Sequence, residues 1–391
     1  MKVDYFSGRF VLVFTIFSIL GPVFSVESDC QARSRSEVKI PNISGYVIVK
    51  CDFHMHSVFS DGEVWPSVRA EEAWRAGLDA FSVTDHIEYH PKKDDIPVNH
   101  NRGYETARPK AEALNLKVIK GAEITRSMPP GHINAIFLKD ANSLDTKEWK
   151  DAVKAAVEQG AFVFWNHPGW IDQQPEGKSV WYDEHTELYE KGWIHGIEII
   201  NGNEYYPIAH KLALEKRLAL LGNSDVHGPI QLDYDLSGGG HRPMTLVLAR
   251  EKTKESIKEA LLSQRTIVYW KNILIGAEKY LKPIFKESIE IINPDVTIKG
   301  QGEVYIQIRN KSEIDFELAA DGTPEEIFVP QNITLKAGKT VLLRIKGKSE
   351  DLLGRRKIHM PYKVENLWVA PSEGLREELI ININFISVKK D

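Results

Sequence analysis

Apolar residues follow two different patterns along the chain, and the pattern changes near Pro283. Before that point, short apolar runs alternate with amphipathic stretches. The apolar runs cover residues 46–51, 80–83, 117–120, 133–138, 161–165, 196–200, 218–221 and 245–248. The amphipathic stretches cover residues 66–76, 104–114, 147–158, 208–215 and 254–262. Strands separated by helices predict βα units in a largely parallel sheet, and their number favours a distorted barrel over a small open sheet.

After Pro283 the apolar runs are separated by turn residues, with no convincing helix between them. Runs with strand character cover residues 304–309, 333–335, 340–345 and 379–385. This pattern predicts a β-sandwich of about a hundred residues. A chain of 391 residues is long enough for two domains. We therefore expect an α/β domain over residues 45–278 and a β-sandwich domain over residues 279–391.

The N-terminal segment has the composition of a secretory signal peptide. Lys2 and Arg9 precede an apolar run over 10–20, which is too short to span a bilayer, and Val23-Phe24-Ser25 supplies small residues at the cleavage positions. We expect cleavage after Ser25, a linker over 26–44, export to the periplasm or beyond the cell, and no membrane span afterwards. A buried N-terminal helix or an uncleaved anchor is the alternative.

Composition and charge narrow the class of partner. The apolar and charged fractions are those of an ordinary soluble globular protein. The net charge of −5 gives no electrostatic reason to expect a long nucleic acid. A small anion can still bind a local cluster of cations. Cys30 and Cys51 are the only cysteines, so the sequence holds no disulfide framework, and the oligomeric state stays open.

Residues with ligand chemistry follow or adjoin six of the apolar runs. The groups are Asp52-Phe53-His54-Met55-His56 with Ser60-Asp61-Gly62, Thr84-Asp85-His86, Gly121-Ala122-Glu123, Gly131-His132, Asn166-His167-Pro168 and Asn223-Ser224-Asp225-Val226-His227. In β/α barrels the side chains at the C-terminal strand ends converge on one face. We therefore expect these groups to meet in one pocket.

The spacing inside two of the groups suits a shared ion. Residues two apart on a strand point to the same side, so His54 and His56 can reach one ion, as can Asp225 and His227. Imidazole together with carboxylate suits zinc, manganese or iron better than magnesium. A single His-x-His or His-Pro arises often by chance. The six groups together favour a metal centre.

In order and content these motifs resemble the polymerase and histidinol phosphatase (PHP) domain family over about residues 50–275. The resemblance implies a distorted (β/α)7 barrel that binds up to three divalent metals. It places His54, His56, Glu123 and Asp225 around the first metal. It places Asp61, His86 and His227 around the second. Glu123 would bridge to a third metal that is held by His132 and His167.

The resemblance also implies hydrolysis of phosphate esters by a hydroxide that bridges the metals. The phosphate needs an in-line nucleophile and positive charge on its oxygens, and no serine or cysteine nucleophile is expected. Beside the metal ligands, we expect Asp85 to orient a ligand imidazole. Arg126 and Arg242 are expected to bind phosphate through bidentate hydrogen bonds.

A signal peptide and an appended β-domain resemble an exported phosphodiesterase branch of that family, so a small phosphodiester is the expected substrate. Hydrolysis of phosphomonoesters, such as nucleotides or sugar phosphates, is the first alternative. An amidohydrolase is the second, because that class also opens with His-x-His on a barrel strand. A non-enzymatic binding protein with a metal-stabilised barrel is the third. The sequence assigns no role to the C-terminal domain.

Overall fold

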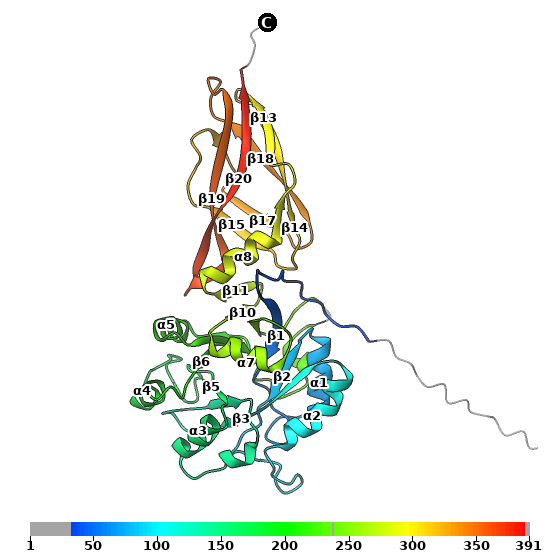
Figure 1. Cartoon of the computed structure of the whole chain (residues 1–391), viewed down its shortest axis with the longest axis vertical. Helices are drawn as coiled ribbons and strands as arrows, with labels where there is room; N and C mark the ends of the chain where they lie inside the picture. The colour runs from blue at the N-terminus through cyan, green and yellow to red at the C-terminus, as the bar shows by residue number, and fades with distance from the viewer. Residues whose placement is uncertain (1–32, 237, 388–391) are drawn as a thin grey trace, which may run out of the picture. The chain divides into compact units, whose positions relative to one another are not determined.

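The computed structural model describes residues 33–236 and 238–387 (Figure 1). The predicted signal peptide and cleavage site lie outside these residues. Among the helices that the structure describes, none is both long and apolar enough to cross a membrane.

Seven strands form the barrel, and the ones predicted from the apolar runs are confirmed. The strands are β1 (Val47–Asp52), β2 (Ala80–Val83), β3 (Lys117–Ile124), β4 (Ile133–Ile136), β5 (Phe162–Trp165), β6 (Gly196–Asn201) and β8 (Ala219–Asn223). β1, β2 and β3 are parallel neighbours, and so are β5, β6 and β8. β4 lies between the two sets and is antiparallel to both β3 and β5.

The antiparallel β4 departs from the expected parallel order for a simple reason. A parallel connection needs a crossover of about a dozen residues or more. The segment between Ile124 and Ile133 is shorter and contains no helix. The chain therefore turns back on itself, and the start of β4 lies at the same edge as the ends of the parallel strands.

The barrel closes between its first and last strands. The backbone N–H of Asp225 donates to the carbonyl of His54 at 2.9 Å, and the N–H of His56 donates to the carbonyl of Val226 at 3.1 Å. β9 (Met244–Ala249) pairs antiparallel with β1, with Thr245 opposite Cys51 near the end of β1. There the Thr245 hydroxyl accepts from the N–H of Gly222 in β8 at 3.0 Å. The ring is therefore continuous but irregular.

Helices cover the outside of the barrel, and the five predicted helices are confirmed. They are α1 (Pro66–Arg75), α2 (Arg102–Ala113), α3 (Trp149–Glu158), α5 (Pro207–Lys216) and α7 (Lys254–Leu262). Further elements are a 3-10 turn η1 (Ala141–Leu144), α4 (Asp183–Glu190), α6 (Ile230–Asp233), β7 (Glu204–Tyr205), β10 (Thr266–Trp270) and β11 (Ile273–Gly276).

The floor of the barrel is apolar and closely packed. Val49, Phe53, Ile119, Phe162 and Leu221 belong to one buried cluster inside the ring. Packing is also close at Gly222 of β8, where a Cβ would lie 2.3 Å from a methyl group of Val268 in a second buried cluster. Water is therefore excluded from beneath the strand ends, which strengthens the electrostatic interactions there.

The C-terminal domain is a sandwich of two sheets. One contains β13 (Asp295–Lys299), β20 (Glu373–Ile386), β19 (Gly354–Ala370), β15 (Phe316–Ala320) and β17 (Asn332–Leu335); the other contains β12 (Ile289–Ile291), β14 (Glu303–Asn310), β18 (Thr340–Gly347) and β16 (Ile327–Phe328). Alternate residues face inward, such as Ile306 and Ile308 of β14 and Leu343 and Ile345 of β18. The predicted β-sandwich is confirmed.

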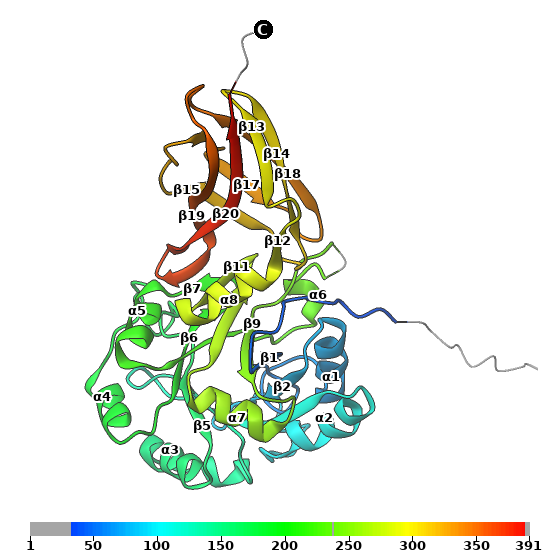
Figure 2. The same ribbon diagram turned by 45° about the horizontal axis from the view of Figure 1, so that its top comes forward.

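The barrel and the sandwich belong to one compact unit. β11 pairs in parallel with β19, with Leu274 opposite Leu367. Helix α8 (Glu278–Ser288) precedes the sandwich (Figures 1 and 2). No convincing helix was expected after about Pro283. In the structure Pro283 lies inside α8, whose buried face includes Leu281, Ile284 and Phe285.

Candidate metal centre

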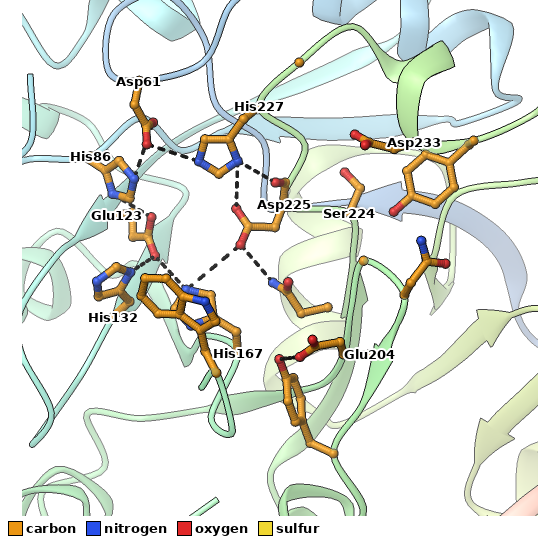
Figure 3. A pocket seen from close by; sticks show the side chains of 17 residues that line it. Asp61, His86, Glu123, His132, His167, Glu204, Ser224, Asp225, His227 and Asp233 are labelled. Carbon is orange, nitrogen blue, oxygen red and sulfur yellow. Dashed lines mark hydrogen bonds and ion pairs between the residues drawn. The ribbon is translucent and has the colours of Figure 1, made fainter. Parts of the chain in front are cut away.

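The residues expected to hold metals come together at one edge of the barrel, around a pocket of about 570 Å³ (Figure 3). They come from the ends of the parallel strands and from the start of the antiparallel β4. Seven of them line the pocket: Asp61, His86, Glu123, His132, His167, Asp225 and His227. His54 and His56 are fully buried.

The central group contains the two histidines that follow β1. Nε2 of His54 lies 3.1 Å from Nε2 of His56 and 3.1 Å from Oδ1 of Asp225. Nε2 of His56 lies 3.0 Å from the same Asp225 oxygen. The two-residue spacing therefore does place both rings beside one carboxylate, as expected for a strand end.

Glu123 connects this group to the histidines on the other side. Its Oε2 lies 3.5 Å from Nε2 of His54 and 2.8 Å from Nδ1 of His86. Its Oε1 lies 3.0 Å from Nδ1 of His132 and 3.5 Å from Nε2 of His167. One carboxylate thus faces two separate sets of imidazoles, which is the arrangement a bridging ligand needs.

A further group surrounds Asp61. Oδ1 of Asp61 lies 3.5 Å from Nε2 of His86 and 3.7 Å from Nδ1 of His56, and Oδ2 lies 3.3 Å from Nε2 of His227. His56 is therefore close to both the central group and this one. Its ring lies 4.2 Å from that of His227 and 4.3 Å from that of His86, centroid to centroid.

The donor atoms of the central group fit a cation. Nδ1 of His54 lies 2.8 Å from Oε1 of Glu198, which as a carboxylate only accepts, so this ring nitrogen carries the proton. In its neutral form, His54 then presents the lone pair of Nε2 toward Asp225. Oδ1 of Asp225 and Oε2 of Glu123 are buried without a hydrogen-bond donor. Several hydrogen-bond acceptors therefore face one another in a buried site, and a positive charge between them is needed to offset their repulsion.

The protonation states of His56 and the two carboxylates also suit metal ligands. Burial, assisted by the nearby His86 and His227, lowers the pKa of His56 to about 3. Burial opposes ionisation of Glu123, but the histidines around it hold the pKa of its carboxyl well below the usual range. Asp225 behaves in the same way, since His54 and His56 outweigh burial and lower its pKa. The carboxylates stay charged and His56 stays neutral at neutral pH. Burial opposes protonation of His54 and His86, but Asp225 and Glu198 raise the pKa of His54, and Glu123 raises the pKa of His86 to about 10, so a cation that binds here replaces protons.

Glu198 was missed by the sequence reasoning. It is fully buried in β6, where Oε1 accepts from His54 and from Asn223 Nδ2, and Oε2 accepts from the backbone N–H of His167 at 2.8 Å. Asn201 donates to Glu198 at 2.9 Å and to Asp225 at 3.1 Å. The available signal was a charged residue in the middle of the apolar run 196–200.

Arg69 of α1 is a second missed residue. Its side chain is fully buried and donates to the backbone carbonyls of His56, Val226, His227 and Gly228. It also forms an ion pair with Glu72 at 2.7 Å. Arg69 therefore ties the segment after β1 to the segment after β8, and both segments carry candidate ligands.

The two arginines expected to bind phosphate are directed elsewhere. Arg126 forms an ion pair with Glu88 at 2.8 Å and donates to the carbonyls of Thr146 and Lys147. Arg242 is fully buried and forms an ion pair with Asp52 at 2.7 Å. Neither lines the pocket. The expectation that they contact a substrate is corrected. The guanidinium of Arg126 already binds protein groups, and the side chain of Arg242 is too deeply buried to reach the pocket.

Asp85 does not orient an imidazole directly either. Its carboxylate accepts from the N–H and hydroxyl of Ser57, at 2.6 and 2.7 Å, and from the hydroxyl of Ser60 at 2.9 Å. The Ser60 hydroxyl lies 3.4 Å from Nδ1 of His56. The influence of Asp85 on that ring is therefore indirect, through the turn that contains Ser57 and Ser60.

Comparison with known proteins adds to this geometry. The family model of the PHP domain matches residues 52–261, and a model of an Ig-like domain matches residues 289–380. A crystal structure from Bacteroides vulgatus, described as a two-domain protein containing a predicted PHP-like metal-dependent phosphoesterase, is 44% identical with a TM-score of 0.84; the match covers 90% of this chain and 100% of that one. An uncharacterized protein of Methanocaldococcus jannaschii is 26% identical over 203 residues, covering 48% of this chain and 85% of that protein.

Proposed function

Because the chain belongs to the PHP domain family, we propose that it is a metal-dependent phosphoesterase whose substrates are small phosphodiesters. The observation that carries the proposal is the set of buried acceptor atoms that face one another around His54, His56 and Asp225. The 44% identical two-domain protein, which carries a predicted activity of this class, supports it.

Up to three divalent cations of the manganese, zinc or iron type are proposed for the pocket. His54, His56, Asp225 and Glu123 would hold the first, and Asp61, His86 and His227 the second. Glu123 would share its other oxygen with a third, beside His132 and His167. When bound, such cations lower the pKa of water and neutralise the charge on phosphate oxygens.

Other side chains position these ligands, and among the described residues none of the nearby serine or cysteine side chains is placed to attack the substrate. Glu198 fixes the ring of His54 through Nδ1, and Asn201 holds Asp225 and Glu198 together. Ser224, the serine that lines the pocket, accepts from Arg242 at 2.7 Å. Cys51 lies in the apolar floor, where burial raises the pKa of its thiol. Neither is placed as a nucleophile, so water is the attacking group in this proposal.

The charge of the pocket favours diesters over monoesters. Among the described residues that line it, none is lysine or arginine. A phosphodiester carries one negative charge, whereas a phosphomonoester carries close to two at neutral pH. Only the proposed cations could therefore neutralise the second negative charge of a phosphomonoester. This difference supports a phosphodiester, which carries the smaller charge, as the substrate.

The proposal is tested with the purified full chain after chelation and reloading with manganese, zinc or iron. We expect hydrolysis of bis(p-nitrophenyl) phosphate to disappear on chelation and to return with metal. We also expect a higher kcat/KM than for p-nitrophenyl phosphate. Turnover that persists with metal shown to be absent would overturn the mechanism, and a clear preference for the monoester would overturn the diester assignment.

A matched pair of variants distinguishes loss of the metal centre from a nonspecific effect of an aspartate-to-asparagine substitution. Asp225→Asn should remove metal-dependent turnover and lower the bound metal content. Asp351→Asn makes the same change at an exposed residue of the C-terminal domain and should alter neither. Full activity in a folded Asp225→Asn variant would exclude Asp225 from the centre.

A further inference from the structure

The pocket extends beyond the candidate ligands into a region that we call the outer pocket. Glu204 and Asp233 line it (Figure 3), and so do the aromatic side chains of Trp170, Tyr206 and Tyr234. Glu204 lies on β7 and Asp233 at the end of α6. The outer pocket and the candidate ligands line one cavity, so a substrate whose phosphate binds at the ligands would place its remaining part here.

The two carboxylates of the outer pocket have only neutral partners among the contacts that the described residues make. Glu204 accepts from the hydroxyl of Tyr206 at 2.8 Å, which is a neutral partner. The proximity of Glu204 also adds to burial in raising the pKa of Tyr206, so this phenol keeps its proton. Within the described part of the chain, neither Glu204 nor Asp233 takes part in an ion pair.

Three basic residues of the barrel domain have other partners. Arg126 and Arg242 are held by Glu88 and Asp52. Lys271 donates to the carbonyl of Asn203 at 3.3 Å and lies over the ring of Trp270, and it does not line the pocket. An anionic group in the outer pocket would therefore meet two negative charges, with no lysine or arginine among the described lining residues to offset them.

We propose that Glu204 and Asp233 make the enzyme select phosphodiesters whose only negative charge is the reacting phosphate. The alcohol components of the substrate are then neutral or cationic, and Trp170, Tyr206 and Tyr234 provide flat apolar surfaces for them. This inference rests on the proposed function, because it assumes that the phosphate binds at the candidate ligands. Like charges that approach within a few ångströms near a protein surface cost enough to reduce binding about tenfold.

The test uses two substrates that differ by one phosphate and share one leaving group. They are the p-nitrophenyl ester of thymidine 5′-phosphate and the same ester with a 3′-phosphate. For the metal-loaded full chain, we expect the 3′-phosphate to lower kcat/KM about tenfold, and added salt to reduce the difference. In Glu204→Gln with Asp233→Asn, the difference should shrink to about twofold or less. Glu350→Gln, at an exposed residue of the C-terminal domain, is the matched control and should keep the full difference.

Two results would overturn the inference. One is equal or faster hydrolysis of the 3′-phosphorylated ester by the unaltered protein. The other is an unchanged difference in the double variant. If no ester is hydrolysed, the proposed function fails, and the inference is then tested by calorimetric binding of thymidine 5′-phosphate and thymidine 3′,5′-bisphosphate. Weaker binding of the bisphosphate, reversed in the double variant, supports the inference, and equal binding overturns it.

Discussion

Glu198 accepts a hydrogen bond from Nδ1 of His54 at 2.8 Å, and both side chains are fully buried. This contact fixes which nitrogen of His54 faces the pocket. Carboxylates that orient a ligand imidazole commonly contribute about 10- to 100-fold to metal affinity.

We therefore expect Glu198→Gln to weaken metal binding by roughly tenfold or more while the protein remains folded. The amide can still pair with His54, but it no longer strengthens the basicity of the ring. Metal content after dialysis against graded chelator measures the effect, with circular dichroism as the check on folding. An unchanged metal affinity would show that Glu198 is a packing residue only.

Replacement of Arg69 should destabilise the barrel. Arg69→Met removes the donors to four backbone carbonyls and leaves Glu72 buried without its partner. The expected loss is about 3–5 kcal/mol in the free energy of unfolding, as for other broken buried ion pairs. Urea denaturation measures it. Arg75→Met, on the same helix but with a partly exposed ion pair to Glu71, should cost less than about 1 kcal/mol.

Acid should destabilise the fold through His185 of α4. Its Nε2 pairs with the carbonyl of Pro130 at 2.8 Å, while Nδ1 accepts from the N–H of Tyr182, so the buried ring is neutral. Burial lowers its pKa to about 4. Because the unfolded chain has a pKa of about 6.5 at this residue, it binds the proton first as the pH falls, and stability declines between about pH 6.5 and 4.

The contribution of His185 over that window is of the order of 3 kcal/mol. Unfolding in urea at several pH values, with chelator throughout, compares the unaltered protein with His185→Gln. We expect a shallower decline for the variant, since glutamine does not titrate. Parallel curves for the two proteins would rule out His185 as a source of the acid sensitivity.

The C-terminal domain should influence substrate binding through Trp368. The ring of Trp368 lies 5.2 Å from that of Tyr205, centroid to centroid, and the two chain neighbours of Tyr205, Glu204 and Tyr206, line the pocket. We expect Trp368→Ala to raise KM about threefold or more with little change in kcat, because the wall loses its support while the candidate ligands do not. Steady-state kinetics on bis(p-nitrophenyl) phosphate measure both constants.

Tyr305→Ala is the control for the Trp368 prediction. Tyr305 is an exposed aromatic residue of the same domain, on β14. The control should leave both constants unchanged. A drop in kcat for Trp368→Ala at constant KM would contradict the positioning role and indicate a disturbed metal centre instead.

The sequence predicts the assembly of the candidate ligands well because their positions follow from strand ends. His86, His167 and Asp225 each come directly after or close to an apolar run, and parallel strand ends share one edge. His132 reaches the same edge for a different reason, since it precedes an antiparallel strand. The roles of these residues as ligands, like the signal peptide and the choice of diester, stay predictions.

Side-chain direction is the part that the sequence did not reveal. Arg242 was expected to bind phosphate, but it pairs with Asp52 on β1, which is far away in the chain. Arg126 is three residues from Glu123, yet it turns outward to Glu88. Pairings across such distances depend on tertiary packing, which neither periodicity nor local spacing encodes. Glu198 shows the converse, because a charge in an apolar strand was a usable signal.

Closure of the barrel joins His54 to Asp225 through their backbones as well as their side chains. These residues are separated by most of the domain, so a nascent polypeptide acquires its cation affinity only late in folding, once the first and last strands have met. Bound metal would then stabilise the contact between the first and last strands. Under mild denaturation, metal release should precede the loss of the circular dichroism signal of the helices. Metal release would therefore report the separation of these two strands.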